Sequence, residues 1–553
     1  MVQSSVPEHH NEMKALDTVH STMNNGIRRT VKFFIFLRYL LAGTVCARDM
    51  RGYDYEGCRL WPAAMTEKYS NPNQIARTVV VDEFEFVLDK IHNDKIHGIL
   101  QHAEKRFLAS LRANIPAHDS PYVYPVNPHQ KSLWPLKGVE IAISNQNQTI
   151  IEHGMDESYE LEIRPVLDNK PLVLLKAKTF VEAMWGIQSF LQLVDFGWFL
   201  EGQKPVFTIE NSPLYIHDRP TYPYRGLLID TSRHYLPMDL ILRNLNAMEA
   251  NKLNVLHWHI VDSQSWPYQS LAYPELSRRG AYCHDCIYTV QDIVKVVQEA
   301  ALRGIRVIPE FDVPGHTASI GKSHPELLSY CDGRYQEPLN VTRPQTYDFL
   351  RTLYDEVMSL FPDSWIHVGG DEVDTTCWEQ SPEIQQWMKQ HNLSHSFQLQ
   401  EYFEDYLFSY LVGKRTPIAW QEVMEQDIPF QRQFPFGRYS NSSIVIDVWK
   451  MWLDRRPFLL KASQYGYRIM ASSCWYLDHL DKDFEFFYSC QPWDFVEIAS
   501  DLQKSLVGGH GSMWGEQVDA NNFFPRVWPR LSAVAEQVSD EKLVLLGESR
   551  LHP

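Results

Sequence analysis

The sequence predicts an α/β protein in which a (β/α)8 barrel follows a small α+β domain. Short apolar strands and amphipathic helices alternate after residue 222, and eight such strands fit into the rest of the chain. Polar and aromatic residues follow nearly all of these strands, at the ends where barrels place their chemistry. A doubly wound open sheet is the alternative architecture. The chain lacks a regular glycine-rich phosphate motif that would favour it, since residues 508–511 are too irregular to qualify.

The N-terminal segment, residues 1–47, has the pattern of a secretory signal. Arg28 and Arg29 precede a short apolar run, which ends in a Val-x-Ala sequence at Ala47. The run is shorter than the ~20 residues that a membrane helix needs, so we expect no stable membrane span. Four Asn-x-Ser/Thr sequons follow, and they support entry into the secretory pathway. These sequons begin at Asn147, Asn340, Asn392 and Asn441.

Residues 55–215 are predicted to form the small α+β domain. An apolar face with helical spacing indicates a helix over 179–194. Proline-rich residues 218–223 mark the boundary with the barrel domain at 222–553. The strands expected in the first domain lie at 78–81, 84–88, 160–163 and 172–175.

The barrel elements are expected in regular alternation along the chain. Amphipathic helices are predicted over 238–251 and 289–302, and helical stretches separate most of the other strands. The eight strands are predicted at 226–231, 253–261, 305–311, 365–368, 417–420, 444–448, 468–472 and 505–508.

Composition narrows the range of partners. A formal net charge of −17 argues against nucleic acid and anionic membrane surfaces. The 16 Trp and 27 Tyr offer faces that stack on sugar rings, although most such residues in any protein belong to the core. His257 and His259 alternate on one strand in the manner of a metal site, but buried hydrogen-bonded histidines are the simpler interpretation. We expect no metal and no cofactor.

The segment 365–373 carries the most specific chemical signal. A hydrophobic strand runs into Gly369 and Gly370, and then into two adjacent carboxylates, Asp371 and Glu372. The glycines allow a sharp turn and the close approach of a ligand. Two crowded acids cannot both ionise easily, so one pKa rises and a general acid becomes available. The pair alone is equally compatible with a Ca²⁺ ligand or a solvated loop.

A family resemblance decides between these interpretations. It covers about residues 75–540 and implies the barrel fold together with an exo-acting, retaining activity on terminal β-linked GlcNAc and GalNAc. The segments 225–237, 256–262, 310–316, 367–374 and 513–516 resemble the lysosomal β-N-acetylhexosaminidases of glycoside hydrolase family 20.

The resemblance also implies roles for particular residues. Glu372 is expected to protonate the glycosidic oxygen. Asp371 is expected to orient the substrate's 2-acetamido group, whose own carbonyl oxygen attacks the anomeric carbon to give an oxazolinium intermediate. Tyr476 is expected to hydrogen-bond the acetamido oxygen. The other expected residues wall in the acetamido methyl group (Trp420, Trp449 and Trp514), hold ring hydroxyls (Arg233, Asp478 and Glu516) or tune Glu372 (Asp262 and His316).

The same resemblance predicts the partners and the compartment. Cys331 and Cys377 match a family disulfide that staples two loops over the active site. The expected partners are terminal N-acetylhexosamine glycans and a second copy of the chain in a homodimer, in the lysosome or after secretion. Two alternatives stay open. One is a catalytically silent glycan-binding protein that has kept the barrel, and the other is a Golgi or secreted enzyme that trims N-glycans or degrades chitooligosaccharides.

Overall fold

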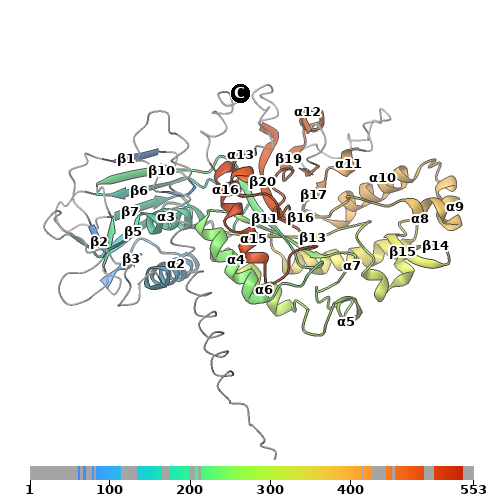
Figure 1. Ribbon diagram of the computed structural model, residues 1–553, viewed down its shortest axis with the longest axis horizontal. Coiled ribbons are helices and arrows are strands. Elements are labelled where there is room, and N and C mark those ends of the chain that lie inside the picture. Colours follow the sequence, from blue (N-terminus) through green and yellow to red (C-terminus); the bar gives the residue numbers. More distant parts are fainter. Residues whose placement is uncertain are drawn as a thin grey trace, which may run out of the picture. The chain divides into compact units, whose positions relative to one another are not determined.

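A closed barrel of eight parallel strands forms the larger part of the computed structural model, and a mixed α+β region precedes it in the chain (Figure 1). The predicted fold class is therefore confirmed. The predicted signal segment and the sequon at Asn441 lie outside the described residues. The structure describes residues 60–62, 66–69, 77–79, 83–113, 134–164, 173–197, 206–209, 213–413, 415–425, 444–450, 455–490 and 504–539.

Within its described residues, the α+β region contains two sheets and two helices. Helix α3 (Phe180–Leu193) packs against strands β6 and β7 and against helix α2 (Asp94–Ala113). The six-stranded mixed sheet has the order β1 (Thr66–Tyr69), β10 (Leu214–Asp218), β6 (Tyr159–Ile163), β7 (Val173–Ala177), β5 (Gly138–Ile143), β3 (Glu85–Val87). The four-stranded sheet has the order β4 (Trp134–Leu136), β2 (Arg77–Val79), β9 (Val206–Ile209), β8 (Asp195–Gly197).

The barrel closes where the last strand pairs in parallel with the first. Strands β11, β12 and β13 are buried along their whole length, which explains why they are nearly continuous apolar runs. In order around the barrel the strands are β11 (Tyr224–Asp230), β12 (Val255–Val261), β13 (Arg306–Phe311), β16 (Trp365–His367), β17 (Thr416–Trp420), β18 (Val445–Val448), β19 (Arg468–Ala471) and β20 (Leu506–Met513).

The last strand differs from its prediction. The strand was expected to end at residue 508, but β20 continues to Met513. The barrel is so tightly closed here that a Cβ atom at Gly509 would lie 2.0 Å from the carbonyl oxygen of Ala471. The glycines are therefore required for strand packing and do not mark a loop.

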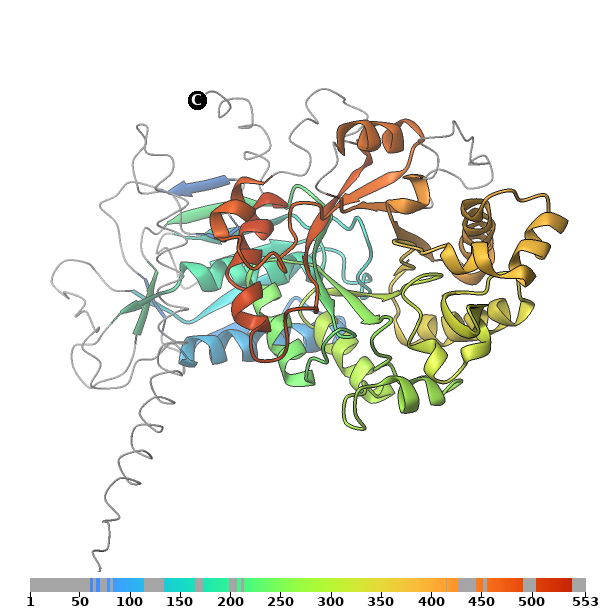
Figure 2. The ribbon, with the colours of Figure 1, turned by 45° about the vertical axis from the view of Figure 1, so that its right-hand side comes forward.

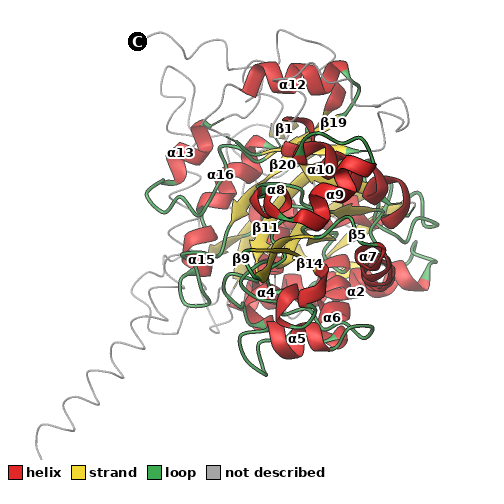
Figure 3. Cartoon of the chain, turned by 90° about the vertical axis from the view of Figure 1, so that its right-hand side faces the viewer, coloured by secondary structure: helices red, strands yellow, loops and turns green. Residues whose placement is uncertain are grey.

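Helices lie outside the barrel strands (Figures 2 and 3). No helix within the described residues is long and apolar enough to cross a membrane. A hairpin of β14 (Leu328–Cys331) and β15 (Arg334–Leu339) is inserted after β13. The α-helices that the structure describes in this domain are α4 (Met238–Ala250), α5 (Glu275–Gly280), α6 (Val290–Ala301), α7 (Pro344–Leu360), α8 (Thr376–Gln380), α9 (Pro382–Gln390), α10 (Ser396–Tyr406), α11 (Glu422–Glu425), α12 (Arg455–Gln464), α13 (Phe484–Ser489), α15 (Phe523–Val527) and α16 (Arg530–Gln537).

A buried ion pair joins the α+β region to the first barrel strand. The Arg225 guanidinium lies 2.6 Å from a carboxylate oxygen of Glu157, and both side chains are buried. The same carboxylate accepts a hydrogen bond from the indole N–H of Trp185. Arg225 lies near the amino end of β11, at the barrel end that supports stability and not chemistry.

The described sequons differ in exposure. Asn147 and Asn392 are exposed. Asn340 is fully buried, and its side-chain oxygen accepts hydrogen bonds from the backbone amide and the hydroxyl of Thr342. A glycan has no room on a buried amide, so this geometry argues against the expected modification of Asn340.

Candidate active site

The predicted site residues gather at one end of the barrel. Parallel strands present all their carboxyl ends at the same rim, so residues far apart in sequence meet there. Their positions are Arg233 after β11, Asp262 after β12, His316 after β13, Asp371 and Glu372 after β16, Trp420 at the end of β17, Trp449 after β18, Tyr476 and Asp478 after β19, and Trp514 and Glu516 after β20.

The turn after β16 places two adjacent acids in different environments. Gly369 has φ +71°, and a Cβ atom there would lie 1.8 Å from a carboxylate oxygen of Asp312, so only glycine fits. Glu372 has φ +49°, a left-handed conformation that is uncommon for a residue with a side chain. The Asp371 side chain is 12% exposed, whereas that of Glu372 is 60% exposed. One carboxylate is therefore held inside the rim while its neighbour faces solvent.

His316 lies between the two acids and a third carboxylate. Its Nδ1 atom is 3.1 Å from Asp262, and its Nε2 atom is 3.6 Å from Asp371 and 3.8 Å from Glu372. Burial disfavours the imidazolium, but the carboxyl groups of Asp312 and Asp371 outweigh this and raise the pKa of His316 well above its ordinary value. In turn, burial would raise the pKa of Asp371, and the charge on His316 lowers it.

A fully buried carboxylate, Glu310, lies in the barrel interior beneath the rim. One of its oxygens is 2.8 Å from both His257 Nε2 and His259 Nδ1. The other accepts a hydrogen bond from the Trp420 indole at 2.8 Å and lies 3.2 Å from His367 Nδ1. Burial would raise the pKa of Glu310, but the imidazoles of His367 and His259 lower it well below its ordinary value. The two alternating histidines thus converge on one carboxylate oxygen, and burial lowers the pKa of His257 to about 3.

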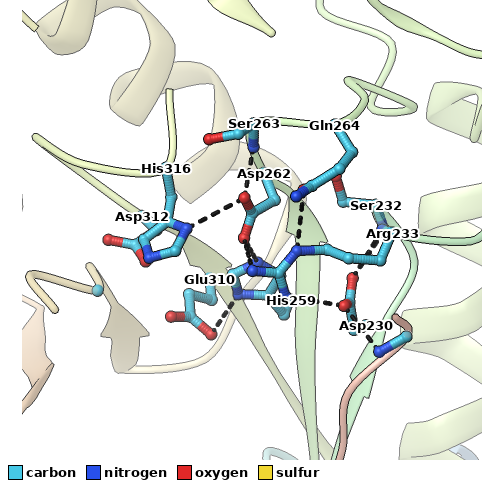
Figure 4. A network of polar contacts seen from close by, with 12 residues as sticks. Asp230, Ser232, Arg233, His259, Asp262, Ser263, Gln264, Glu310, Asp312 and His316 are labelled. Carbon is cyan, nitrogen blue, oxygen red and sulfur yellow. Dashed lines mark hydrogen bonds and ion pairs between the residues drawn. The ribbon is translucent and has the colours of Figure 1, made fainter. Parts of the chain in front are cut away.

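His259 connects this interior carboxylate to the rim (Figure 4). Its Nε2 atom lies 2.9 Å from Asp262, so a continuous series of polar contacts runs from Glu310 through His259 and Asp262 to His316. Burial disfavours the charged form of His259, but the negative charge of Glu310 prevails and raises its pKa well above the ordinary value. The alternation of acid and base along the series lets each charge stabilise the next.

Four aromatic side chains form a packed cluster at the same rim as the acids. Trp420, Trp449, Tyr476 and Trp514 pack together over Leu228. The rings of Trp449 and Tyr476 stack with centroids 6.1 Å apart, and those of Trp420 and Trp514 lie 5.9 Å apart at 45°. Burial raises the pKa of the Tyr476 hydroxyl well above its ordinary value, so it stays a neutral hydrogen-bond donor. Aromatic side chains with one polar hydroxyl among them suit a small ligand that has a methyl end and a polar end.

Arg233 connects the acids to the aromatic cluster. Its guanidinium lies 3.0 Å from Asp230, 2.8 Å from Asp262 and 3.4 Å from Glu516, and it sits 5.2 Å above the ring of Trp514. The ion pair with Asp230 gives this arginine a structural role in addition to its expected contact with ligand hydroxyls. Because the Glu516 side chain is 54% exposed, the outer side of this cluster is open to a ligand.

Three disulfides stabilise the surroundings. Cys331 at the end of β14 is bonded to Cys377 in α8, and this bond joins the β14–β15 hairpin to the segment that follows Glu372. The other two bonds join Cys283 to Cys286 and Cys474 to Cys490.

Comparison with known proteins assigns the chain to a family. A model described as glycosyl hydrolase family 20, catalytic domain, matches residues 222–541, and one described as beta-acetyl hexosaminidase like matches residues 60–193. Over 499 residues the chain is 36% identical to the beta-hexosaminidase subunit beta of Mus musculus, covering 88% of this chain and 87% of the relative. The chain belongs to glycosyl hydrolase family 20. The Homo sapiens beta-hexosaminidase subunit beta is 39% identical over 414 residues, covering 73% of this chain and 70% of the relative.

Solved structures of this family share the fold. A Flavobacterium johnsoniae chitobiase superposes with a TM-score of 0.67 at 27% identity, covering 88% of this chain and 70% of that one. A Streptomyces plicatus beta-hexosaminidase in complex with the product GlcNAc gives 0.63 at 20% identity, covering 87% and 90%, which supports the fold alone.

Sequence reasoning missed three residues of this family 20 site. Asp312 is buried and accepts a hydrogen bond from the backbone amide of Gly370, although it follows a strand in a loop-like context. The sequence predicts no role for Glu310, and for His259 only that of a buried hydrogen-bonded histidine. The available signal was the presence of titratable residues inside otherwise apolar strands, because such residues are buried only when they are paired.

The two buried acids Asp312 and Asp262 should respond differently to substitution. Burial and the charge of Asp371 raise the pKa of Asp312 well above its ordinary value, so its contribution to stability is present at acidic pH and lost as pH rises. Burial would raise the pKa of Asp262, but hydrogen bonds from His259 and His316 lower it, so its contribution is present at neutral pH and lost on acidification. At pH 7 we expect Asp312→Asn to leave the unfolding free energy unchanged or higher, and Asp262→Asn to lower it by about 3–5 kcal/mol. Urea unfolding of both variants checks this, and equal losses would show that Asp312 is ionised.

Proposed function

We propose that the protein is an exo-acting, retaining β-N-acetylhexosaminidase that removes terminal β-linked GlcNAc and GalNAc from glycoconjugates. The observation that carries the proposal is the pair Asp371 and Glu372, one held inside and one exposed, at the barrel rim that also carries a cluster of four aromatic side chains. The beta-hexosaminidase subunits that are 36–39% identical to this chain support the same activity.

In the first step, the acetamido carbonyl oxygen attacks the anomeric carbon as the glycosidic bond breaks. Glu372 gives its proton to the departing oxygen, and a bicyclic oxazolinium ion forms. The Asp371 carboxylate accepts the acetamido N–H and stabilises the positive charge that develops there. In the second step, Glu372 takes a proton from water, which attacks the same carbon. The bond from that carbon to the acetamido oxygen breaks, so the acetamido group is regenerated and the β configuration is restored.

Adjacent acids suit this route because the substrate supplies its own nucleophile. A retaining enzyme with a carboxylate nucleophile places its two acids about 5–5.5 Å apart on opposite sides of the bond. Here Asp371 needs only to contact the acetamido group, next to the acid that protonates the leaving group. The charge on His316, 3.8 Å from Glu372, favours the carboxylate that Glu372 becomes during the step.

The aromatic cluster holds the acetamido group in the position from which it attacks. Trp420, Trp449 and Trp514 enclose the methyl group, and the Tyr476 hydroxyl donates to the carbonyl oxygen. Restricting this group to one orientation lowers the entropic part of the barrier. Arg233, Glu516 and Asp478 bind ring hydroxyls at the other side of the sugar.

The assembly and compartment follow the relatives by resemblance. We infer that the chain forms a homodimer, acts in the lysosome or after secretion, and carries glycans at Asn147 and Asn392, which are exposed. Light scattering on purified protein, before and after glycosidase treatment, measures the oligomeric state and the mass of the attached glycans.

The substrate requirement provides the first test of the proposed reaction. We expect hydrolysis of 4-nitrophenyl β-GlcNAc and β-GalNAc but essentially none of the β-glucoside, because glucose lacks the acetamido nucleophile. A thiazoline analogue of the oxazolinium ion should inhibit strongly. Mass spectrometry should find no sugar covalently attached to Asp371 or Glu372; an adduct on either residue would contradict the mechanism.

Glu372→Gln keeps the shape of the side chain and removes the proton donor. We expect kcat on natural oligosaccharides to fall by at least ~10²-fold with folding intact. Substrates with very good leaving groups should lose less, because they need less protonation. Asp374→Asn, a change to an exposed acid two residues along, serves as the matched control and should keep nearly full activity. Near-normal turnover by the Glu372 variant would exclude it as the acid.

Asp478 should make discrimination against sulfated sugars depend on pH. Burial, and then the charge of Glu516, raise the pKa of Asp478 to about 7, so it is neutral at acidic pH and ionises as pH rises. Repulsion between its carboxylate and a substrate 6-sulfate is of the order of a few kcal/mol at an intermediate dielectric. We expect the kcat/KM ratio of 4-nitrophenyl β-GlcNAc to its 6-sulfate to grow between pH 5 and pH 8, and Asp478→Asn to remove this growth. A ratio that is constant with pH would show that Asp478 does not contact the 6-position.

A further inference from the structure

Glu337 in strand β15 contacts the two loops that carry His316 and Asp262. One carboxylate oxygen accepts three hydrogen bonds, from the Ser263 hydroxyl at 2.6 Å, the Thr317 amide at 2.9 Å and the Ala318 amide at 3.0 Å. Ser263 directly follows Asp262, and Thr317 directly follows His316. The carboxylate therefore joins the backbone segments on both sides of the Asp262–His316 contact.

The loop after His316 has the geometry of a backbone anion site. His316 has φ +52°, and the next two backbone N–H groups point to the same carboxylate oxygen. Successive amides that follow a left-handed residue form a concave site for an anion, and a carboxylate filling it stabilises an otherwise costly conformation. Glu337 thus holds His316 in the backbone conformation from which its ring reaches Asp371 and Glu372.

Ser263 connects Glu337 to Asp262 through two hydrogen bonds. Its hydroxyl donates to Glu337, and its backbone N–H donates to Asp262 at 2.5 Å. Glu337 is half-buried and also lines an open surface groove with Lys322, Tyr335 and Asp374. Because Glu337 lies outside the apolar core, substituting it removes the hydrogen bonds without opening a core cavity.

We propose that Glu337 is a positioning residue that fixes the Asp262–His316 pair against the catalytic acid. Glu337 acts through the two loops and needs no contact with substrate. The inference rests on the proposed roles of Glu372 and His316. Without the carboxylate, the Thr317 and Ala318 amides hydrogen-bond to water instead, and His316 is no longer held at a fixed distance from Glu372. A displacement of about 1 Å at such a site costs up to ~10²-fold in rate.

Steady-state kinetics with two aryl glycosides test the proposal. For Glu337→Ala we expect kcat on phenyl β-GlcNAc, which has a poor leaving group, to fall about 10- to 100-fold with KM changed less than about threefold. On 2,4-dinitrophenyl β-GlcNAc, which needs little protonation, kcat should fall much less. Glu337→Gln keeps a carbonyl oxygen for the three donors and should retain kcat within about threefold.

Two further variants keep the test decisive. Ser263→Ala removes one of the three hydrogen bonds and should show the same leaving-group dependence in weaker form, even where Glu337→Ala fails to fold. Glu326→Ala, at an exposed glutamate in the same inserted region, is the matched control and should behave as the unaltered protein. Equal losses on both substrates, or none, would overturn the positioning role while leaving the proposed function standing. Failure of the unaltered protein to hydrolyse either glycoside would instead overturn the proposed function.

Discussion

The imidazole of His316 sits among four acidic side chains, and the organisation of the rim depends on this arrangement. It contacts Asp262 on one side and faces Asp371 and Glu372 on the other, with Asp312 nearby. So many acids at one end of a barrel would repel one another if all were ionised. A positive charge on His316 at their centre offsets this repulsion, and burial together with the charge of Asp371 raises the pKa of Asp312 well above its ordinary value. The left-handed backbone at His316 and the glycine turn after β16 are the local distortions that bring the groups to these distances.

The two ends of the barrel differ in how far their charged side chains are exposed to solvent. At the amino end, Arg225 and Glu157 form a buried ion pair. Both side chains also hydrogen-bond to other protein groups, so neither charge needs contact with solvent. At the carboxyl end, Glu372 and Glu516 are more than half exposed, although the residues behind them are buried. An active site needs both kinds of residue, since the exposed ones must reach a substrate and the buried ones must hold them rigidly. Glu310 and His259 are buried residues of this kind beneath the rim.

Burial accounts for the places where sequence patterns misled. The glycine-rich residues 508–511 have poor strand propensity, yet the closing strand requires them because neighbouring carbonyl groups leave no room for side chains. Asp312 follows an apolar strand in a loop-like context, and only its contact with Gly370 shows that it belongs to the acid cluster. The sequon at Asn340 fits the local pattern, but the folded chain uses that amide oxygen to accept hydrogen bonds from Thr342.

The sequence by itself determined the order of the elements, the fold class and the residues that reach the rim. Period and polarity are local properties, and parallel strands in a barrel must bring their carboxyl ends together, so strand-end residues such as Glu372 and Trp514 are found without coordinates. Only the tertiary structure decided which acid is buried, which is exposed, and which carries a proton. Those properties depend on distances between side chains from different strands, and the pairing of Glu337 with loops at 263 and 317 is one such distance that no local pattern encodes.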